Sequence, residues 1–460
     1  MTDQQIASIV PAQGRRFRAY SVKHLDGLIA RAGLSAAERL AVRAVATVLP
    51  FRTNDYVVES LIDWSAAPDD PIYRLVFPQA DMLSAGDIGP IADLLVREAP
   101  QQEIQAAAHA VRMRLNPHPA GQLALNIPEV GEDPLPGVQH KYPETVLVFP
   151  KQGQTCHAYC TYCFRWAQFV DEPDLKMATG DITKVADYLR AHREVTSVLI
   201  TGGDPMIMGA AVLRRYIEPL LDAGLEHIES IRIGTKSLAY WPQRFVTDPD
   251  ADDTLRLFEE VAAAGKSLAL MAHFSHPREL QPPMVAAAAQ RIRAAGAVIR
   301  TQAPLIRSIN DDDRIWADMW RAQLRMGMVP YYMFVERDTG PQGYFAVPLA
   351  RAAEVFRDAY SSVSGLCRTV RGPSMSATPG KVCIDGIAEI AGQKVFALHM
   401  IQARDPSLVG RPFFARFDPE AVWLTDLEPA FASRFPFDLV PCPPAERSVL
   451  WAPDLLLAAD

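Results

Sequence analysis

Cysteine is scarce in this chain of 460 residues, which contains only six. A secreted domain held together by disulfides would be far richer in cysteine, so the count favours a reducing compartment. Long hydrophobic runs are also missing, since none approaches the roughly 18 residues that a membrane span needs. The N-terminus shows no apolar core of a signal peptide. We therefore expect a soluble, cytoplasmic protein with no membrane partner.

A strong excess of one charge is absent too. The chain has 46 basic and 54 acidic side chains, which gives a formal net charge of −8. This balance argues against nucleic acid or an anionic membrane as the main partner. The remaining composition, 49% hydrophobic and 22% charged, is that of a folded globular protein with two or three subdomains.

A repeated pattern of strand followed by helix occupies the middle of the chain. Six steps at intervals of roughly 30–50 residues predict parallel strands and an α/β fold. Because a complete barrel has eight strands, we expect an open, partial (β/α)6 barrel with functional loops after the strands. The predicted strands are 144–149, 195–200, 230–235, 267–274, 297–302 and 328–335, and the predicted helices include 211–223, 254–264, 284–295 and 313–326. Four helices should end at a glycine, namely Gly224, Gly265, Gly296 and Gly327.

The flanking segments divide the chain into three predicted regions. Residues 1–135 are expected to be a helical N-terminal region, with helices near 35–48 and 91–115. Residues 136–336 should form the parallel barrel, and the repeat should stop after about residue 336. The C-terminal region, 337–460, contains an alternating segment that predicts short antiparallel strands in a small α+β extension.

Three of the cysteines lie within eight residues, at Cys156, Cys160 and Cys163, on the loop after the first predicted strand. Thiolates are soft ligands that suit zinc, copper(I) or an iron–sulfur cluster. Three of them can hold three irons of a cubic cluster and leave the fourth iron open to a small molecule. A structural zinc site would need a fourth ligand, and His157 is badly placed to provide one. An accidental group of buried cysteines is the simpler alternative.

A second motif, Thr201-Gly202-Gly203-Asp204, follows the next predicted strand. Two glycines let a ligand approach the backbone, and a carboxylate can accept hydrogen bonds from an ammonium group. Many glycine-rich turns bind nothing, so this motif is weak by itself.

The cysteine spacing, with Tyr162 before the third cysteine, resembles the motif of radical S-adenosylmethionine (SAM) enzymes. That resemblance implies a [4Fe–4S] cluster on the three cysteines and SAM bound to its fourth iron. It also implies that Gly202, Gly203 and Asp204 bind SAM through its amino group, and that Tyr162 contacts the adenine. The fold of that superfamily is a partial barrel of parallel strands, as the repeat predicts.

The resemblance extends, over roughly residues 50–385, to the lysine 2,3-aminomutase family. Its matching stretches are HKYP (140–143), LITGGDP (199–205), RIGTKSLAYWPQR (232–244), HFSHP (273–277), VPYYMFV (329–335) and TPGK (378–381). The family implies an isomerase that converts an α-amino acid to a β-amino acid with pyridoxal 5′-phosphate (PLP) as a further cofactor.

The family also implies roles for individual residues. Lys381 would be the catalytic lysine that carries PLP. Lys141 stands where the family usually has an arginine for the PLP phosphate, and lysine lacks the two-pronged geometry of arginine. Tyr142 is assigned to cofactor binding beside it. Arg165 would bind the α-carboxylate of the substrate through two parallel hydrogen bonds, although a structural ion pair is an alternative.

The residues for the distal group of the substrate depart from the lysine-specific pattern. Lysine-acting members hold the distal ammonium with two aspartates. Arg337 falls on the first of these positions, and no carboxylate occupies the second, within 372–376. Since a cation repels an ammonium group, we expect an acidic substrate, glutamate or aspartate. If Asp338 took the place of Arg337, the chain would instead be a lysine 2,3-aminomutase.

Zinc is not expected. Lysine-acting members hold a structural zinc with extra cysteines near the C-terminus, whereas Cys367, Cys383 and Cys442 are widely separated here. His273 and His276 have metal-like spacing, but we expect them to be hydrogen-bonded residues of the pocket.

The expected partners are an amino-acid substrate and an external one-electron reductant of the flavodoxin or ferredoxin type. Association into a homo-oligomer is left open. Two other functions compete with the aminomutase: a related PLP-dependent radical SAM enzyme that catalyses another rearrangement or an elimination, and an iron–sulfur electron carrier. The Gly202–Asp204 loop and Lys381 argue against a carrier, because a carrier needs neither an amino-group binder nor a reactive lysine.

Overall fold

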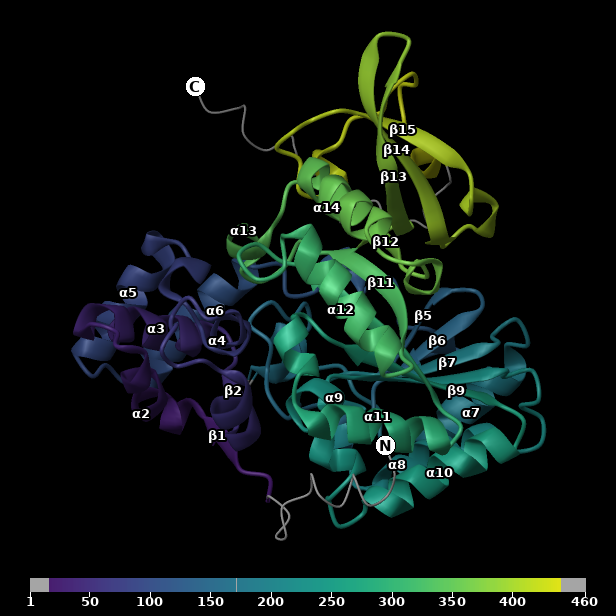
Figure 1. Cartoon of the computed structure of the whole chain (residues 1–460), viewed down its shortest axis with the longest axis horizontal. Coiled ribbons are helices and arrows are strands. Elements are labelled where there is room, and N and C mark those ends of the chain that lie inside the picture. The colour runs from purple at the N-terminus through teal and green to yellow at the C-terminus, as the bar shows by residue number, and fades with distance from the viewer. Residues whose placement is uncertain (1–15, 171, 440–460) are drawn as a thin grey trace.

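A computed structural model describes residues 16–170 and 172–439 of the chain (Figure 1). Its central element is an eleven-stranded sheet with the order β15-β14-β13-β12-β11-β10-β9-β8-β7-β6-β5. The strands are β5 (Val138–Tyr142), β6 (Thr145–Val148), β7 (Ser197–Ile200), β8 (Ser230–Thr235), β9 (Ser267–His273), β10 (Val298–Leu305), β11 (Val329–Val335), β12 (Arg371–Ser376), β13 (Gly380–Ile390), β14 (Gln393–Ala403) and β15 (Pro412–Arg416).

The six predicted strands all occur, as β6 to β11, and each pairs in parallel with the next. The expectation that the repeat stops after about residue 336 is wrong, because β12 also pairs in parallel with β11. The sequence of β12, RGPSMS, contains glycine and proline and no β-branched residue, so it lacks the usual signature of a strand. The chain therefore has an α/β fold with seven consecutive parallel strands.

Helices connect the parallel strands and group around them in Figure 1. They are α7 (Ile182–Ala191), α8 (Ala210–Ile217), α10 (Ala251–Ala263), α11 (Pro283–Ala294), α12 (Asp313–Arg325) and α14 (Leu349–Ser361). The four glycines predicted to follow helices have positive φ angles, between 71° and 89°. Glycine adopts this left-handed conformation without steric cost, and Gly265, Gly296 and Gly327 each stand two positions after the last residue of a helix, so these three predicted ends are confirmed. The end predicted at Gly224 is wrong, because α8 ends at Ile217 and the 3-10 turn that follows it ends at Leu221.

The N-terminal segment is largely helical and shares a hydrophobic core with the parallel strands. Its elements are β1 (Ala19–Ser21), α2 (Leu25–Ile29), α3 (Ala36–Val48), β2 (Arg52–Asn54), α4 (Pro71–Val76), α5 (Ala85–Val96) and α6 (Gln101–Arg114). The single helix expected near 91–115 is in fact two, α5 and α6. Pro100 stands immediately before α6, and proline cannot donate the hydrogen bond that would continue a helix through this position.

The C-terminal segment adds antiparallel strands to the sheet. Strands β13 and β14 form a hairpin of 11 residues on each side, longer than the short strands expected, and β15 pairs with β14. Val382, Ile384, Phe396 and Leu398 are buried in a second hydrophobic core beneath them. Within the described residues, no helix is long and apolar enough to cross a membrane.

Candidate active site

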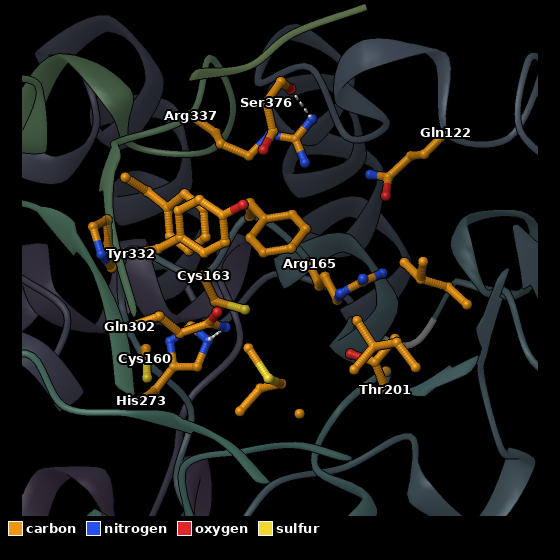
Figure 2. A pocket seen from close by; sticks show the side chains of 18 of the residues that line it. Gln122, Cys160, Cys163, Arg165, Thr201, His273, Gln302, Tyr332, Arg337 and Ser376 are labelled. Atoms are coloured by element: carbon orange, nitrogen blue, oxygen red, sulfur yellow. Dashed lines mark hydrogen bonds between the residues drawn. The ribbon is translucent and has the colours of Figure 1, made fainter. Parts of the chain in front are cut away.

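One cavity of about 330 Å³ lies where the parallel strands end. Loops after β6 and β7 line it, together with the last residues of β8 to β11. Every site residue expected from the sequence contributes to its wall: Lys141, Tyr142, Cys156, Cys160, Tyr162, Cys163, Arg165, Gly202, Gly203, Asp204, Arg337 and Lys381. In the view of Figure 2, Arg337 and Ser376 lie above Tyr332, and Cys160 and His273 lie below it.

The three clustered cysteines are free thiols in the loop that follows β6. Burial raises the pKa of Cys163 to about 12 and raises that of Cys156 well above its usual value, and neighbouring thiols add to both effects. Asp204 also raises the pKa of Cys156. Negative thiolates therefore oppose one another here, and a bound iron cluster would relieve that repulsion. The donor set fits a cluster with one open iron.

The N-terminal segment holds the cysteine loop in place. The backbone amide of Thr161 donates to the Leu75 carbonyl oxygen over 2.9 Å, and that of Tyr159 donates to the Arg52 carbonyl oxygen over 2.8 Å. Asn54 Nδ2 donates to the carbonyl oxygen of His157 over 3.2 Å. Sequence reasoning did not reveal these contacts, because each joins residues far apart along the chain.

His157 does not line the cavity. Its Nδ1 lies 3.2 Å from Ser237 Oγ, and burial lowers its pKa to about 3. The imidazole is therefore a neutral part of the core, which agrees with its exclusion as a metal ligand.

The glycine loop after β7 packs directly on the cysteine loop. Gly203 N donates to the Gly153 carbonyl oxygen over 3.1 Å, and Asp204 N donates to that of Thr155 over 2.7 Å. A Cβ at Gly203 would overlap the Thr155 carbonyl oxygen and lie 2.5 Å from the Thr155 nitrogen. Only glycine allows the two backbones to approach this closely.

The carboxylate of Asp204 is buried and already accepts several hydrogen bonds. Thr235 Oγ1 donates over 2.7 Å, the backbone amides of Met206 and Lys236 each donate over 2.9 Å, and Ser237 Oγ donates over 3.2 Å. Both oxygens are engaged, so the side chain links the loop after β7 to the end of β8. Burial nevertheless raises the pKa of Asp204, against the effect of these donors.

Cations outnumber carboxylates in the cavity wall. The cations are Lys141, Arg165, Arg232, Lys236, Arg337 and Lys381, and the carboxylates are Asp204 and Glu336. Buried nitrogens of three of these arginines have no hydrogen-bond partner among the described residues: Arg165 Nη1, Arg232 Nε and Arg337 Nε. Buried donors without acceptors are costly, so this wall is suited to anionic ligands such as a phosphate and carboxylates.

Lys381 is the second residue of β13. Its Nζ is 4.2 Å from the centre of the Tyr332 ring. Burial lowers the pKa of Lys381 to about 7, and Arg371 and Arg232 reinforce that effect. Burial also lowers the pKa of Lys141 well below its usual value, with contributions from Arg404 and Arg337, and Lys141 Nζ donates to the Ala377 carbonyl oxygen. The two lysines fit a cofactor that carries an aldehyde and a phosphate.

Arg337, not Asp338, faces the cavity. Arg337 Nη2 donates to the Ser376 carbonyl oxygen over 3.1 Å (Figure 2). The guanidinium lies 4.9 Å from the centre of the Phe164 ring. Asp338 accepts at its backbone oxygen from Asn116 Nδ2 over 2.7 Å. Of the two residues that compete for the distal position, the cation is therefore the one that lines the cavity.

Sequence reasoning missed Lys236 and Gln302 among the lining residues, but it did expect His273 there. His273 Nε2 accepts from the amide of Gln302 over 2.7 Å, and burial lowers the pKa of His273 to about 3. Lys236 forms a 2.8 Å ion pair with the fully buried Glu279. Both His273 and Lys236 occur in the sequence stretches that match the family. Those matches were the signal that could have identified Lys236 too as a residue of the cavity. His276 is not in the cavity wall, so the expectation of two pocket histidines is only half correct.

Comparison with known proteins identifies the family to which the chain belongs. No family model matches the chain. Over 390 residues it is 30% identical to the putative L-lysine 2,3-aminomutase of Aquifex aeolicus, a match that covers 85% of this chain and 90% of that protein. The chain belongs to the lysine 2,3-aminomutase family. As a member it is a radical SAM isomerase, and the cofactors of the family are a [4Fe–4S] cluster, SAM and PLP.

Two further matches are more limited. The L-lysine 2,3-aminomutase of Clostridium subterminale is 27% identical over 269 residues, which is 58% of this chain and 61% of that protein. Among solved structures, a radical SAM methyltransferase from Sphaerobacter thermophilus aligns with a TM-score of 0.36 and 14% identity, covering 63% of this aminomutase-family chain and 94% of that one. This structural likeness is too weak to bear on the fold.

Proposed function

We propose that this member of the aminomutase family moves the α-amino group of an acidic amino acid, glutamate or aspartate, to the β-carbon. In this proposal the seven parallel strands act as a partial barrel of the radical SAM type. Of the proposed N-terminal region 1–135, the described residues 16–135 close the cysteine side of the barrel. Of the proposed C-terminal region 337–460, the described residues 337–439 contribute Lys381. A flavodoxin- or ferredoxin-type protein supplies single electrons.

The cofactors are assigned to the cavity wall. Cys156, Cys160 and Cys163 would hold the cluster. The loop of Gly202 and Gly203, with Tyr162, would hold SAM, and Asp204 would order that loop because its oxygens are already engaged. Lys381 would carry PLP, with Lys141 at its phosphate and Tyr142 beside it. When bound, the cluster and SAM supply a radical that abstracts hydrogen, and PLP carries the migrating amino group.

The protein contributes charge and position. With a pKa of about 7, Lys381 has a substantial neutral fraction at neutral pH, and only a neutral amine is nucleophilic. Arg165 would hold the α-carboxylate, for which its unpaired Nη1 is available. Burial of these groups excludes water and strengthens each charge interaction.

The choice of an acidic substrate rests on one observation: Arg337 lines the cavity with an unpaired Nε, whereas Asp338 does not line it. A distal carboxylate would pair with this guanidinium, and a distal ammonium would be repelled by it. Lysine is the second candidate, because the relatives are named as L-lysine 2,3-aminomutases.

Replacing Arg337 separates the two candidates. In the reduced holoenzyme, Arg337→Asp should lower kcat/KM for the acidic substrate about 100-fold, which corresponds to the loss of a buried charge pair. The same change should improve turnover of lysine. Arg321→Gln, at an exposed ion pair, should change neither rate. An Arg337→Asp enzyme with wild-type iron and PLP content and unchanged rates for both substrates would overturn the assignment.

A further inference from the structure

A second cluster of metal-ligating side chains lies on the β13–β14 hairpin, away from the cavity. Cys383 Sγ, a carboxylate oxygen of Asp385 and a ring nitrogen of His399 all lie within 4.8 Å of one another. None of the three residues lines the cavity. Zinc was not expected from the sequence, because Cys367 and Cys383 are far apart along the chain. In the folded hairpin, however, a carboxylate and an imidazole lie beside the Cys383 thiol.

The hairpin backbone brings these side chains to one place. Cys383 and His399 are directly opposite each other in the antiparallel pair. Opposed residues have their Cβ atoms roughly 5 Å apart on the same face of the sheet. The register therefore places a thiol beside an imidazole.

A bulge adds the carboxylate. Ile384 pairs with Leu398 and Gly386 pairs with Ala397, so Asp385 is an extra residue with no partner on β14. The φ angle of Gly386 is +155°, a conformation that is nearly restricted to glycine. A bulge bends its strand and re-aims the extra side chain. Here the Asp385 carboxylate lies 2.8 Å from His399 Nδ1.

The donor set has a definite chemical preference. A thiolate, an imidazole and a carboxylate together suit zinc, which accepts all three ligand types in a tetrahedral site. The Cys383 side is buried, whereas the side chains of His399 and Asp385 are 30% and 44% exposed. Solvent can therefore reach the cluster and supply a fourth ligand.

We propose that Cys383, Asp385 and His399 bind one Zn²⁺ ion, with water as the fourth ligand. The bound ion would link β13 to β14 through Cys383, which is two residues from Lys381. It would therefore stabilise the strand that carries this lysine. The site uses none of the residues that bind cofactor or substrate in the proposed function, so it stands whether or not that function is correct.

Zinc content of the cluster-loaded enzyme tests the site. Holoenzyme exposed to excess Zn²⁺ and then freed of unbound metal should retain about one zinc per chain by elemental analysis. Asp385→Asn and His399→Gln change partly exposed side chains and should each weaken zinc binding at least tenfold. Cys383→Ser should do the same, whereas Cys367→Ser should retain wild-type zinc because no ligand set surrounds that thiol among the described residues. Iron content should be equal in all samples.

Zinc X-ray absorption of the same holoenzyme identifies the ligands. We expect one sulfur neighbour at about 2.3 Å and nitrogen or oxygen neighbours at about 2.0–2.1 Å. The proposal is overturned if the holoenzyme retains no zinc, if the Asp385→Asn and His399→Gln variants bind zinc as tightly as wild type, or if zinc enters only as iron is lost. A spectrum with three sulfur neighbours would place the ion on the cluster cysteines and would also reject the site.

Discussion

The surroundings of Lys381 change the chemistry of its side chain. Its amine is buried next to Arg232 and Arg371, and the resulting pKa of about 7 is well below that of an exposed lysine. The cations that depress this pKa belong to β8 and β12, so the effect was not visible in the sequence. The sequence singled out this lysine by its motif, and its burial predicts that the amine is partly neutral near pH 7.

The pH dependence of PLP incorporation should report this environment. Only the neutral amine reacts, so the rate at which PLP combines with the apoenzyme should rise with pH, with a midpoint at about pH 7, and level off roughly one pH unit higher. Arg232→Gln removes a cation that disfavours the protonated amine, so the midpoint should move to higher pH. Stopped-flow absorbance measures both. A wild-type midpoint above about pH 9 would contradict the account.

Arg165 should act through the geometry of its guanidinium. Arg165→Lys keeps the positive charge but removes the paired donors, so kcat/KM should fall about 10- to 100-fold with most of the effect in KM. Steady-state kinetics on enzyme with matched iron and PLP content tests this. Arg190→Lys, on an exposed helix surface, is the control. Equal kinetics for Arg165→Lys and wild type would show that Arg165 has only a structural role.

Elements that carry regular periodicity were predictable from the sequence. Strands β6 to β11 lie within a few residues of their predicted positions. Each is a short apolar run in a sequence where strands and helices alternate, which is a clear signal for a strand. Strand β12 was missed because its Gly-Pro sequence carries no strand signal. The cysteine and glycine loops were recognisable as motifs, but the backbone contacts between them follow only from how β6 and β7 pair.

Those loop contacts make Gly203 sensitive to any side chain. Gly203→Ala places a methyl group against the Thr155 backbone, so the cysteine loop must shift. We expect iron incorporation during reconstitution to fall to less than half of the wild-type value. Gly343→Ala, where an added Cβ meets no atom within 4 Å, should incorporate iron normally. Full iron content and unchanged cluster spectra in Gly203→Ala would refute the close packing.

At the scale of the whole molecule, the N-terminal helices and the parallel strands share one hydrophobic core. The carboxylate of Asp70 is fully buried, accepts from Tyr73 N over 2.8 Å and pairs with Arg278 of the segment after β9. Partners so far apart along the chain cannot be inferred from one sequence, because the residues around Asp70 give no indication that Arg278 lies beside it. The division of the chain into three regions stays a prediction. One hydrophobic core contains residues of all three regions, including Val355 and Val370 of the third.

Loss of this pair should weaken the entire fold. Asp70→Ala leaves Arg278 without its partner and removes a helix cap, so the free energy of unfolding should fall by about 3 kcal/mol. Asp69→Ala is the matched control, because the Asp69 side chain is 79% exposed and its pair with Arg74 should be worth less than about 1 kcal/mol. Denaturant unfolding of both variants gives the comparison. A similar small loss in each would show that the buried pair does not join the two parts.

The most direct test of the proposed function is a competition between substrates. Reduced holoenzyme with SAM and PLP is given glutamate, aspartate and lysine at equal concentrations, and the β-amino acids are identified by NMR. The cationic wall around Arg337 predicts β-glutamate or β-aspartate with little or no β-lysine. Formation of β-lysine alone would contradict the assignment and return the chain to the activity for which its relatives are named.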